Sequence, residues 1–134
     1  MTAMRPLGGQ VDHAVSAFLD DVEERGLSDR ILLIITGEMG RNPMLNAKGG
    51  RDHWGSLTPL VFAGGGLNMG QVIGKSDRRG GEPATERYTP QHLLGTIMNT
   101  LFDVERMGMG LDTGAPRDLT EIISGSPRID PLFA

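Results

Sequence analysis

The chain has 134 residues, no cysteine, 22% charged residues and a formal net charge of −4 at pH 7. This length accommodates one modest domain, and the absence of cysteine excludes disulfide bonds and thiolate metal sites. Because the charge is mild and both signs are interspersed, nothing indicates affinity for nucleic acid or membranes, and no apolar run reaches membrane-spanning length.

An amphipathic helix is predicted over about Val11–Arg25. Its apolar residues recur with the i, i+3, i+4, i+7 spacing of one helix face: Val11, Ala14, Val15, Phe18, Leu19 and Val22. Gly26 supplies a C-terminal stop, and four residues then lead into an apolar run at Ile31. A helix that feeds a buried strand is half of a βαβ unit, so we expect the chain to start partway through a fold.

Two apolar runs predict strands. Ile31–Ile35 contains five apolar residues, three of them β-branched, and Leu57–Ala63 is followed by Gly64-Gly65-Gly66. Short apolar runs bounded by turn residues are typical of strands buried on both faces of a parallel sheet. We therefore expect Ile31–Ile35 and Leu60–Ala63 to be neighbouring central strands, with helices packed on the sheet. The triple glycine lacks the spacing of a phosphate loop and predicts a sharp turn.

The rest of the chain contains one more strong helix signal. Gln71–Gly74 is long enough only for a strand fragment or an edge, and charged, glycine-rich Lys75–Arg87 predicts an exposed loop. Thr89 has the character of an N-cap followed by proline, so Pro90–Phe102 is predicted as a second amphipathic helix. Beyond it the sequence is irregular, with a final strand or short turn over Leu119–Ile123.

The residues that could carry chemistry follow the first strand, where open α/β sheets collect their ligands. Glu38 is either a ligand for a divalent cation or a general base, or a solvated carboxylate paired with an arginine. His53 suits a metal as a neutral imidazole whose tautomer Asp52 would fix, or it is a loop histidine bound to backbone. Arg41 and Arg51 are candidate donors to a sulfate or phosphate group, or solvated charges.

These residues lie in segments that resemble a known superfamily. LIITGEMG at residues 33–40 is similar to the strand and T-S-D-H-G segment of the alkaline phosphatase/sulfatase superfamily. GRDHW at 50–54 and PLVFAGGG at 59–66 resemble its later G-x-H segment and the strand that follows. A closer resemblance is to the DUF1501 family of bacterial sulfatase-like proteins, with the pattern G-E-F-G-R-x-P, G-R-D-H-W, L-A-G-G-G and G-x-S-D. About Val11–Phe133 fits the C-terminal part of such a protein.

The resemblance implies an α/β fold: a partial three-layer α/β/α sandwich of alkaline phosphatase-like type with a mostly parallel sheet. The 134 residues would form the C-terminal portion of one domain whose N-terminal part, with the nucleophile, is absent. Glu38 falls on an aspartate metal ligand of the superfamily and His53 on its later histidine ligand, whereas Met39 stands where a histidine ligand is expected. The implied cofactor is a divalent metal ion (zinc, calcium or magnesium).

The function that the resemblance implies is that of a fragment of a sulfatase-like, metal-dependent hydrolase of sulfate or phosphate esters, inactive alone. Its partners would be a small anionic ester or a sulfated glycan, bound by Arg41 and Arg51, and the missing N-terminal part of the domain. The family resemblance suggests an exported or periplasmic protein. The alternative is a non-catalytic glycan- or protein-binding module with a degenerate metal site. Met39 favours that alternative, and the retained spacing from Glu38 to His53 argues against it.

Overall fold

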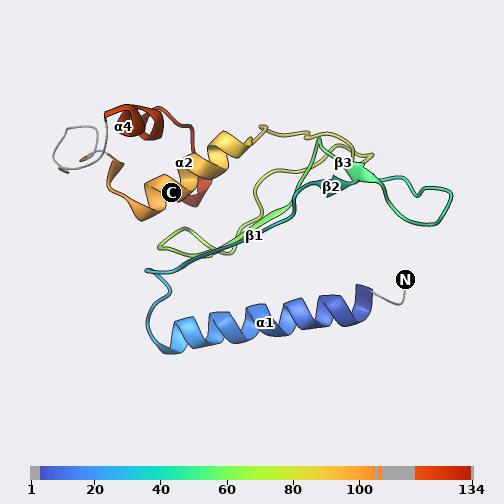
Figure 1. The fold of residues 1–134 in the computed structure, drawn as a ribbon, viewed down its shortest axis with the longest axis horizontal. Helices are drawn as coiled ribbons and strands as arrows, with labels where there is room; N and C mark the ends of the chain where they lie inside the picture. Colours follow the sequence, from blue (N-terminus) through green and yellow to red (C-terminus); the bar gives the residue numbers. More distant parts are fainter. Residues whose placement is uncertain (1–3, 105, 107–116, 134) are drawn as a thin grey trace.

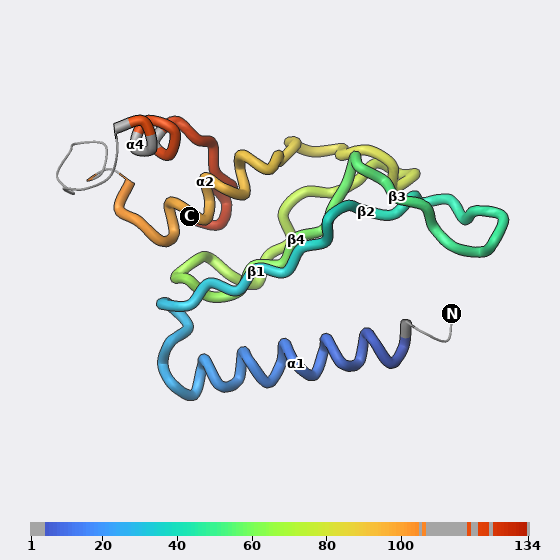
Figure 2. The backbone as a smooth tube through the Cα atoms, in the orientation of Figure 1, coloured from blue at the N-terminus to red at the C-terminus, as the bar shows by residue number. Residues whose placement is uncertain are grey.

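The computed structural model describes residues 4–104, 106 and 117–133. Helix α1 (Met4–Glu24) comes first, followed by four short strands, helices α2 (Pro90–Leu101) and α4 (Arg117–Ser124), and the 3₁₀ helix η1 (Asp130–Leu132). Figures 1 and 2 show a narrow two-stranded ribbon with α1 along one side and α2, α4 and η1 on the other. In the described part of the chain, no helix combines the length and apolar character needed to cross a membrane.

The strands form one nested antiparallel arm. β1 (Leu32–Thr36) pairs with β4 (Leu60–Gly64), so that Leu32 lies opposite Gly64 and Thr36 opposite Leu60. Further along the same arm, β2 (Gly40–Arg41) pairs with β3 (His53–Trp54). The loop between β2 and β3 therefore projects from the far end of the arm, away from α2 and α4 (Figure 1).

The predicted mostly parallel sheet, and with it the alkaline phosphatase-like sandwich, is wrong. Ile31–Ile35 and Leu60–Ala63 do lie in neighbouring strands, but the pair is antiparallel and forms a sheet of two strands. A parallel pair needs a crossover connection, usually a helix. Residues 37–59 contain two prolines and five glycines, which disfavour a helix, and they fold into the β2–β3 hairpin instead. The strands are also only partly buried, with Val61 51% exposed.

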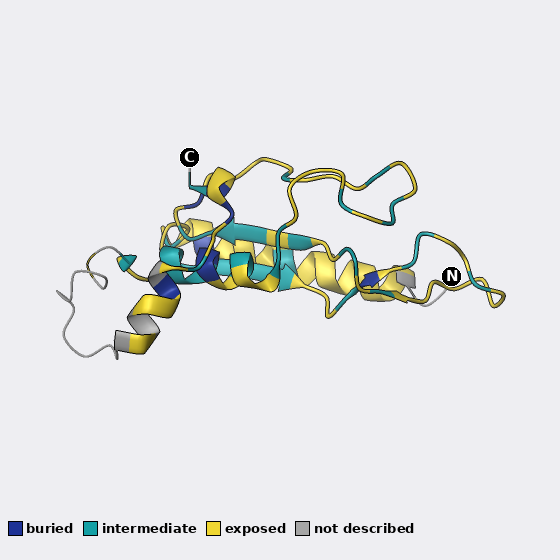
Figure 3. Cartoon of the chain, turned by 90° about the horizontal axis from the view of Figure 1, so that it is seen from above, coloured by how far each residue is buried: buried dark blue, intermediate teal, exposed yellow. Residues whose placement is uncertain are grey.

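Helix α1 confirms the predicted amphipathic helix and begins at Met4, about two turns earlier than expected. Only Val22 on its apolar face is buried, at 6% exposure, whereas Val11 is 56% exposed. A cavity of about 300 Å³ separates the C-terminal half of the helix from the sheet face that carries Leu33 and Ala63. Most of α1 is accordingly exposed, as Figure 3 shows.

The hydrophobic core lies on the opposite face of the ribbon. Leu67, Ile129 and Leu132 are buried there, with Leu32 and Phe62 of the sheet packed against them. Helix α2 holds the C-terminal segment at this core. The hydroxyl of Thr96 on α2, which is fully buried, accepts a 2.9 Å hydrogen bond from the backbone N–H of Ile129. At Gly95 the α2 backbone lies so close to the carbonyl of Pro127 that no Cβ would fit.

Helix α2 confirms the second predicted helix, with Thr89 as N-cap and Pro90 as its first residue. The Nδ1 atom of His92 accepts the backbone N–H of Thr89 at 3.2 Å, so this histidine caps the helix. The final strand or turn expected over Leu119–Ile123 is wrong, because these residues lie in α4. Leu119, Ile122 and Ile123 have the i, i+3, i+4 spacing of a short amphipathic helix.

The chain exposes much more surface than a compact protein of its size. Its accessible surface is 10190 Å². A folded monomer of 14.4 kDa is expected to expose about 6,800 Å². The difference reflects the arm-like shape and the uncovered face of α1, so only a small part of the chain is held by core packing.

Candidate functional site

The outer hairpin brings two of the four predicted site residues together. Arg41 on β2 lies directly opposite His53 on β3, and Gly40 lies opposite Trp54. Side chains of directly opposed residues in an antiparallel pair project from the same face, with Cβ atoms roughly 4.5–5.5 Å apart. A guanidinium and an imidazole therefore share one face of the hairpin, and both residues are exposed. Gly40 is required here because its backbone lies against the carbonyl of Leu57 with no room for a Cβ.

The loop between these strands, residues 42–52, is held by its own asparagines. The Oδ1 atom of Asn46 accepts the backbone N–H groups of Lys48 and Gly50, each at 3.0 Å. Its Nδ2 group donates to the carboxylate of Asp52 at 2.8 Å. Asn42 closes the base of the loop, where its N–H donates to the carbonyl of Asp52 at 2.8 Å. The loop is thus held by hydrogen bonds among its own residues.

Both candidate arginines take part in this loop. The guanidinium of Arg51 donates to the carbonyl of Asn42 at 2.9 Å and also to that of Pro43. The guanidinium of Arg41 donates to the carbonyl of Arg51 at 3.4 Å. An arginine has five N–H donors, so each side chain retains donors for an anion after these contacts. Arg51 is therefore a structural residue of the loop as well as a candidate anion ligand.

The two predicted metal ligands, Glu38 and His53, are both exposed and lie on different segments of the arm. Glu38 lies in the bend between β1 and β2 and forms no hydrogen bond or ion pair with any residue that the structure describes. His53 lies on β3, and Asp52 beside it is bonded to Asn46 rather than to the imidazole. Within residues 4–104, 106 and 117–133, no group of three or more His, Cys, Asp or Glu side chains is placed to hold a metal ion. That Glu38 and His53 together bind one metal ion stays a prediction.

A second loop packs against the hairpin. Trp54 donates its indole N–H to the carbonyl of Gly81 at 2.6 Å, and the hydroxyl of Ser56 donates to the Glu82 carboxylate at 2.8 Å. An isolated bridge between Ser76 and Pro83 closes this loop into a narrow turn. Lys75–Arg87 is mostly exposed, as predicted for this loop, and its role in holding the hairpin is a finding of the structure.

Asp77 organises that turn. Its carboxylate accepts the backbone N–H of Gly81 at 2.8 Å, and its own N–H donates to the carbonyl of Glu82 at 2.8 Å. The hydrogen bond from Gly81 lowers the pKa of the Asp77 carboxyl below its ordinary value of 3.8, because it stabilises the charged form. The signal in the sequence was an aspartate shortly before a glycine pair, which is typical of an Asx turn.

The triple glycine is a turn, as predicted. Gly64, Gly65 and Gly66 all have positive φ, at 78°, 68° and 69°. The N–H of Gly65 is shared between the carbonyls of Ser28 and Ile31, at 2.8 and 2.9 Å. This N–H is therefore satisfied within the protein. Its hydrogen bonds fix the turn after β4 against the segment that precedes β1.

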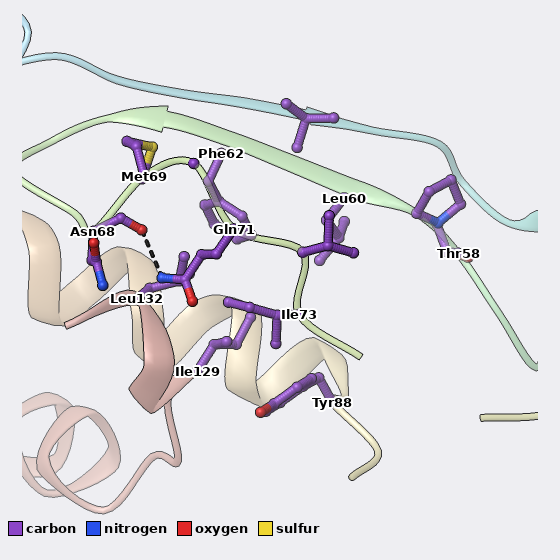
Figure 4. A pocket seen from close by; sticks show the side chains of 14 residues that line it. Thr58, Leu60, Phe62, Asn68, Met69, Gln71, Ile73, Tyr88, Ile129 and Leu132 are labelled. Carbon is purple, nitrogen blue, oxygen red and sulfur yellow. Dashed lines mark hydrogen bonds between the residues drawn. The ribbon is translucent and has the colours of Figure 1, made fainter. Parts of the chain in front are cut away.

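A cavity lies beyond the triple glycine. It measures about 470 Å³ and is lined mainly by apolar residues of β4, of the segment after the glycines and of the C-terminus, including Leu60, Phe62, Ile73, Ile129 and Leu132. Figure 4 shows Gln71 reaching across it, where its Nε2 group donates to the carbonyls of Asn68 and Pro131 at 2.8 Å each. This amide holds the cavity wall together, and none of the four predicted site residues lines the cavity.

Comparison with known proteins identifies the family. The profile of a family described as "Protein of unknown function (DUF1501)" matches residues 2–130. No match was found among curated proteins or among solved structures. The matched region spans nearly the whole chain and includes the β2–β3 hairpin, its loop and the turn that packs on it. The chain therefore belongs to the DUF1501 family.

Proposed function

We propose that this chain is the C-terminal part of a sulfatase-like, metal-dependent hydrolase of sulfate or phosphate esters. The observation that supports the proposal is the direct opposition of Arg41 and His53 across the β2–β3 pair. This register sets a cationic hydrogen-bond donor beside a potential metal ligand on one face of the hairpin. The antiparallel fold lends the proposal no support, so it rests on this site and on the motif spacing.

In the proposed site, Arg41 and Arg51 hold the anionic group of the ester. A guanidinium binds sulfate or phosphate oxygens through paired N–H donors, and Arg51 is pre-positioned by its bonds to the loop carbonyls. Glu38 and His53 would be two ligands of the divalent ion. When bound, such an ion would polarise an ester oxygen as a Lewis acid.

We assign no nucleophile to this chain, and we propose that the nucleophile lies in an N-terminal segment of a longer protein. The 134-residue chain alone should therefore show no ester hydrolysis. Robust hydrolysis that a point change within the chain abolishes would contradict this division of roles.

Anion binding tests the proposal directly. Calorimetric titration of the full chain with sulfate and with phosphate, at constant ionic strength, should show binding that Arg41→Gln weakens by about tenfold, the loss expected for one charge-assisted contact. Arg30→Gln is the matched control, because Arg30 is exposed and precedes β1. Equal binding by the wild type and by Arg41→Gln would contradict the proposal.

The second candidate is a non-catalytic module that binds glycan or protein. It is favoured by the partly buried thioether of Met39, a poor ligand for hard cations, and by the lack of a third metal ligand in the described residues. Binding of a sulfated oligosaccharide that is insensitive to chelator and to Glu38→Gln would favour this module over the hydrolase.

A further inference from the structure

The loop at the end of the arm displays two neighbouring apolar side chains. Met44 is 76% exposed and Leu45 is 60% exposed. They lie between Asn42 and Asn46, the two residues whose side chains organise the loop. The Oδ1 atom of Asn42 accepts the N–H of Met44 at 2.9 Å, which fixes the backbone at this point. The apolar pair is thus presented by an ordered loop.

Met44 and Leu45 are adjacent in a loop that its own hydrogen bonds hold in place. Isolated apolar residues are common on protein surfaces, but two adjacent ones at the tip of a projecting, hydrogen-bonded loop form a contact point. Figure 1 shows this loop as the outermost feature beyond β2 and β3. Among the described residues, neither Met44 nor Leu45 packs against the hydrophobic core.

Exposed basic residues lie in the same loop and in the turn that packs on the hairpin. Residues 38–87 contain seven Lys or Arg and five Asp or Glu, a net charge of +2, whereas the whole chain carries −4. Lys48 belongs to the loop itself and is exposed. Arg78 and Arg79 are exposed in the turn that packs on the hairpin, and Gly80 beside them lies against Pro43, so that a Cβ on Gly80 would sit 3.5 Å from the Pro43 Cβ.

An acidic cluster lies on α1. The C-terminal half of α1 carries Asp20, Asp21, Glu23 and Glu24. Figure 1 places that end of α1 at the opposite end of the molecule from the β2–β3 loop. The charge is therefore polarised along the long axis. An anionic surface would attract the β2–β3 loop and repel the C-terminal end of α1. Repulsion by the distant acidic end is screened, because the Debye length is about 8 Å at physiological ionic strength.

The mild charge of the whole chain predicted no membrane affinity, but from the exposed pair and the local basic residues we propose that the loop of residues 42–52 docks this protein on the surface of an anionic lipid bilayer. Met44 and Leu45 enter the boundary between headgroups and acyl chains, and Lys48, Arg78 and Arg79 contact the lipid phosphates. The inference is independent of the ester site proposed above. A sulfated glycan would satisfy the basic residues, but it offers no apolar phase for Met44 and Leu45, so the exposed pair favours the bilayer.

Vesicle sedimentation with the full chain tests the proposal. The chain should bind vesicles of phosphatidylcholine with about 30% phosphatidylglycerol, not vesicles of phosphatidylcholine alone, and salt should weaken binding. The double variant Met44→Ser/Leu45→Ser should lower the partition coefficient at least about tenfold, since both apolar contacts are lost. Lys48→Gln should lower it about fivefold.

Val72→Ser is the matched control, because Val72 is 96% exposed and apolar but belongs neither to the loop of residues 42–52 nor to the turn that carries Arg78 and Arg79. It should bind vesicles like the wild type, and far-UV circular dichroism should show that all variants keep the wild-type helix content. No binding to anionic vesicles, or equal binding by the double serine variant, would overturn the proposal. Binding to heparin that falls in Lys48→Gln but not in the double serine variant, without vesicle binding, would assign the basic end to a polyanionic glycan instead.

Discussion

The indole N–H of Trp54 donates a 2.6 Å hydrogen bond to the carbonyl of Gly81, a residue 27 positions later in the chain. This contact joins the β2–β3 hairpin to the turn organised by Asp77. It explains why the only tryptophan of the chain lies beside His53: the indole anchors the strand from which the imidazole projects.

Replacing Trp54 by phenylalanine should release the turn from the hairpin. The Gly81 carbonyl would lose its partner in a half-buried position, so the free energy of unfolding should fall by about 1–2 kcal/mol. Urea unfolding followed by circular dichroism measures this change. Ser56→Ala, which removes the neighbouring exposed hydrogen bond to Glu82, should cost less than about 0.5 kcal/mol. A larger loss in Ser56→Ala than in Trp54→Phe would contradict the anchoring role.

Asp77 should make stability depend on acid pH. Its pKa is lowered in the folded state, chiefly by the N–H of Gly81. Its contribution to stability is therefore present above the unfolded value near 3.8 and is lost as pH falls through the lower folded value. Urea midpoints of the wild type and of Asp77→Asn, compared at neutral pH and through the acid range, should converge as the carboxyl protonates. A constant difference across that range would contradict the assignment.

Thr96 should be the most sensitive hydroxyl of α2. Its Oγ1 atom donates to the carbonyl of His92 at 2.7 Å and accepts from the N–H of Ile129 at 2.9 Å, and the side chain is fully buried. Thr96→Val keeps the shape but leaves the Ile129 N–H unpaired, so unfolding free energy should fall by about 1–3 kcal/mol. Thr100→Val is the control, because the described hydrogen bond of Thr100 is a single one to the Thr96 carbonyl, at 2.8 Å. Equal losses in the two variants would show that the contact with Ile129 contributes little.

Local signals predicted α1 and α2 but not α4. Thr89 and Pro90 mark the start of α2 in the sequence because an N-cap and a first-turn proline act within one turn. The stripe from Val11 to Val22 likewise predicted α1. Its exposure was not foreseen, because periodicity shows which face is apolar and not whether anything covers it.

The sequence did not predict the direction of the strands or the packing of Lys75–Arg87 on the hairpin. The run Ile31–Ile35 fits a parallel strand and a partly covered antiparallel one equally well, since both are rich in β-branched residues. The direction follows from the 37–59 segment, which turns back as a hairpin. The bond between Trp54 and Gly81 joins residues with no shared periodic pattern, so the contribution of Lys75–Arg87 to the site emerged only from the structure.

The central claim is that Glu38 and His53 bind one metal ion, and titration of the full chain with Zn²⁺ tests it most directly. Two protein ligands bind weakly, so saturation is expected only at high metal concentration. Glu38→Gln and His53→Gln should each reduce affinity, and the double variant should lose little more than either single one, because the ligands act on the same ion. His13→Gln, which alters an exposed histidine of α1, should bind like the wild type. Unchanged affinity in both single variants, or fully additive losses in the double variant, would contradict the claim.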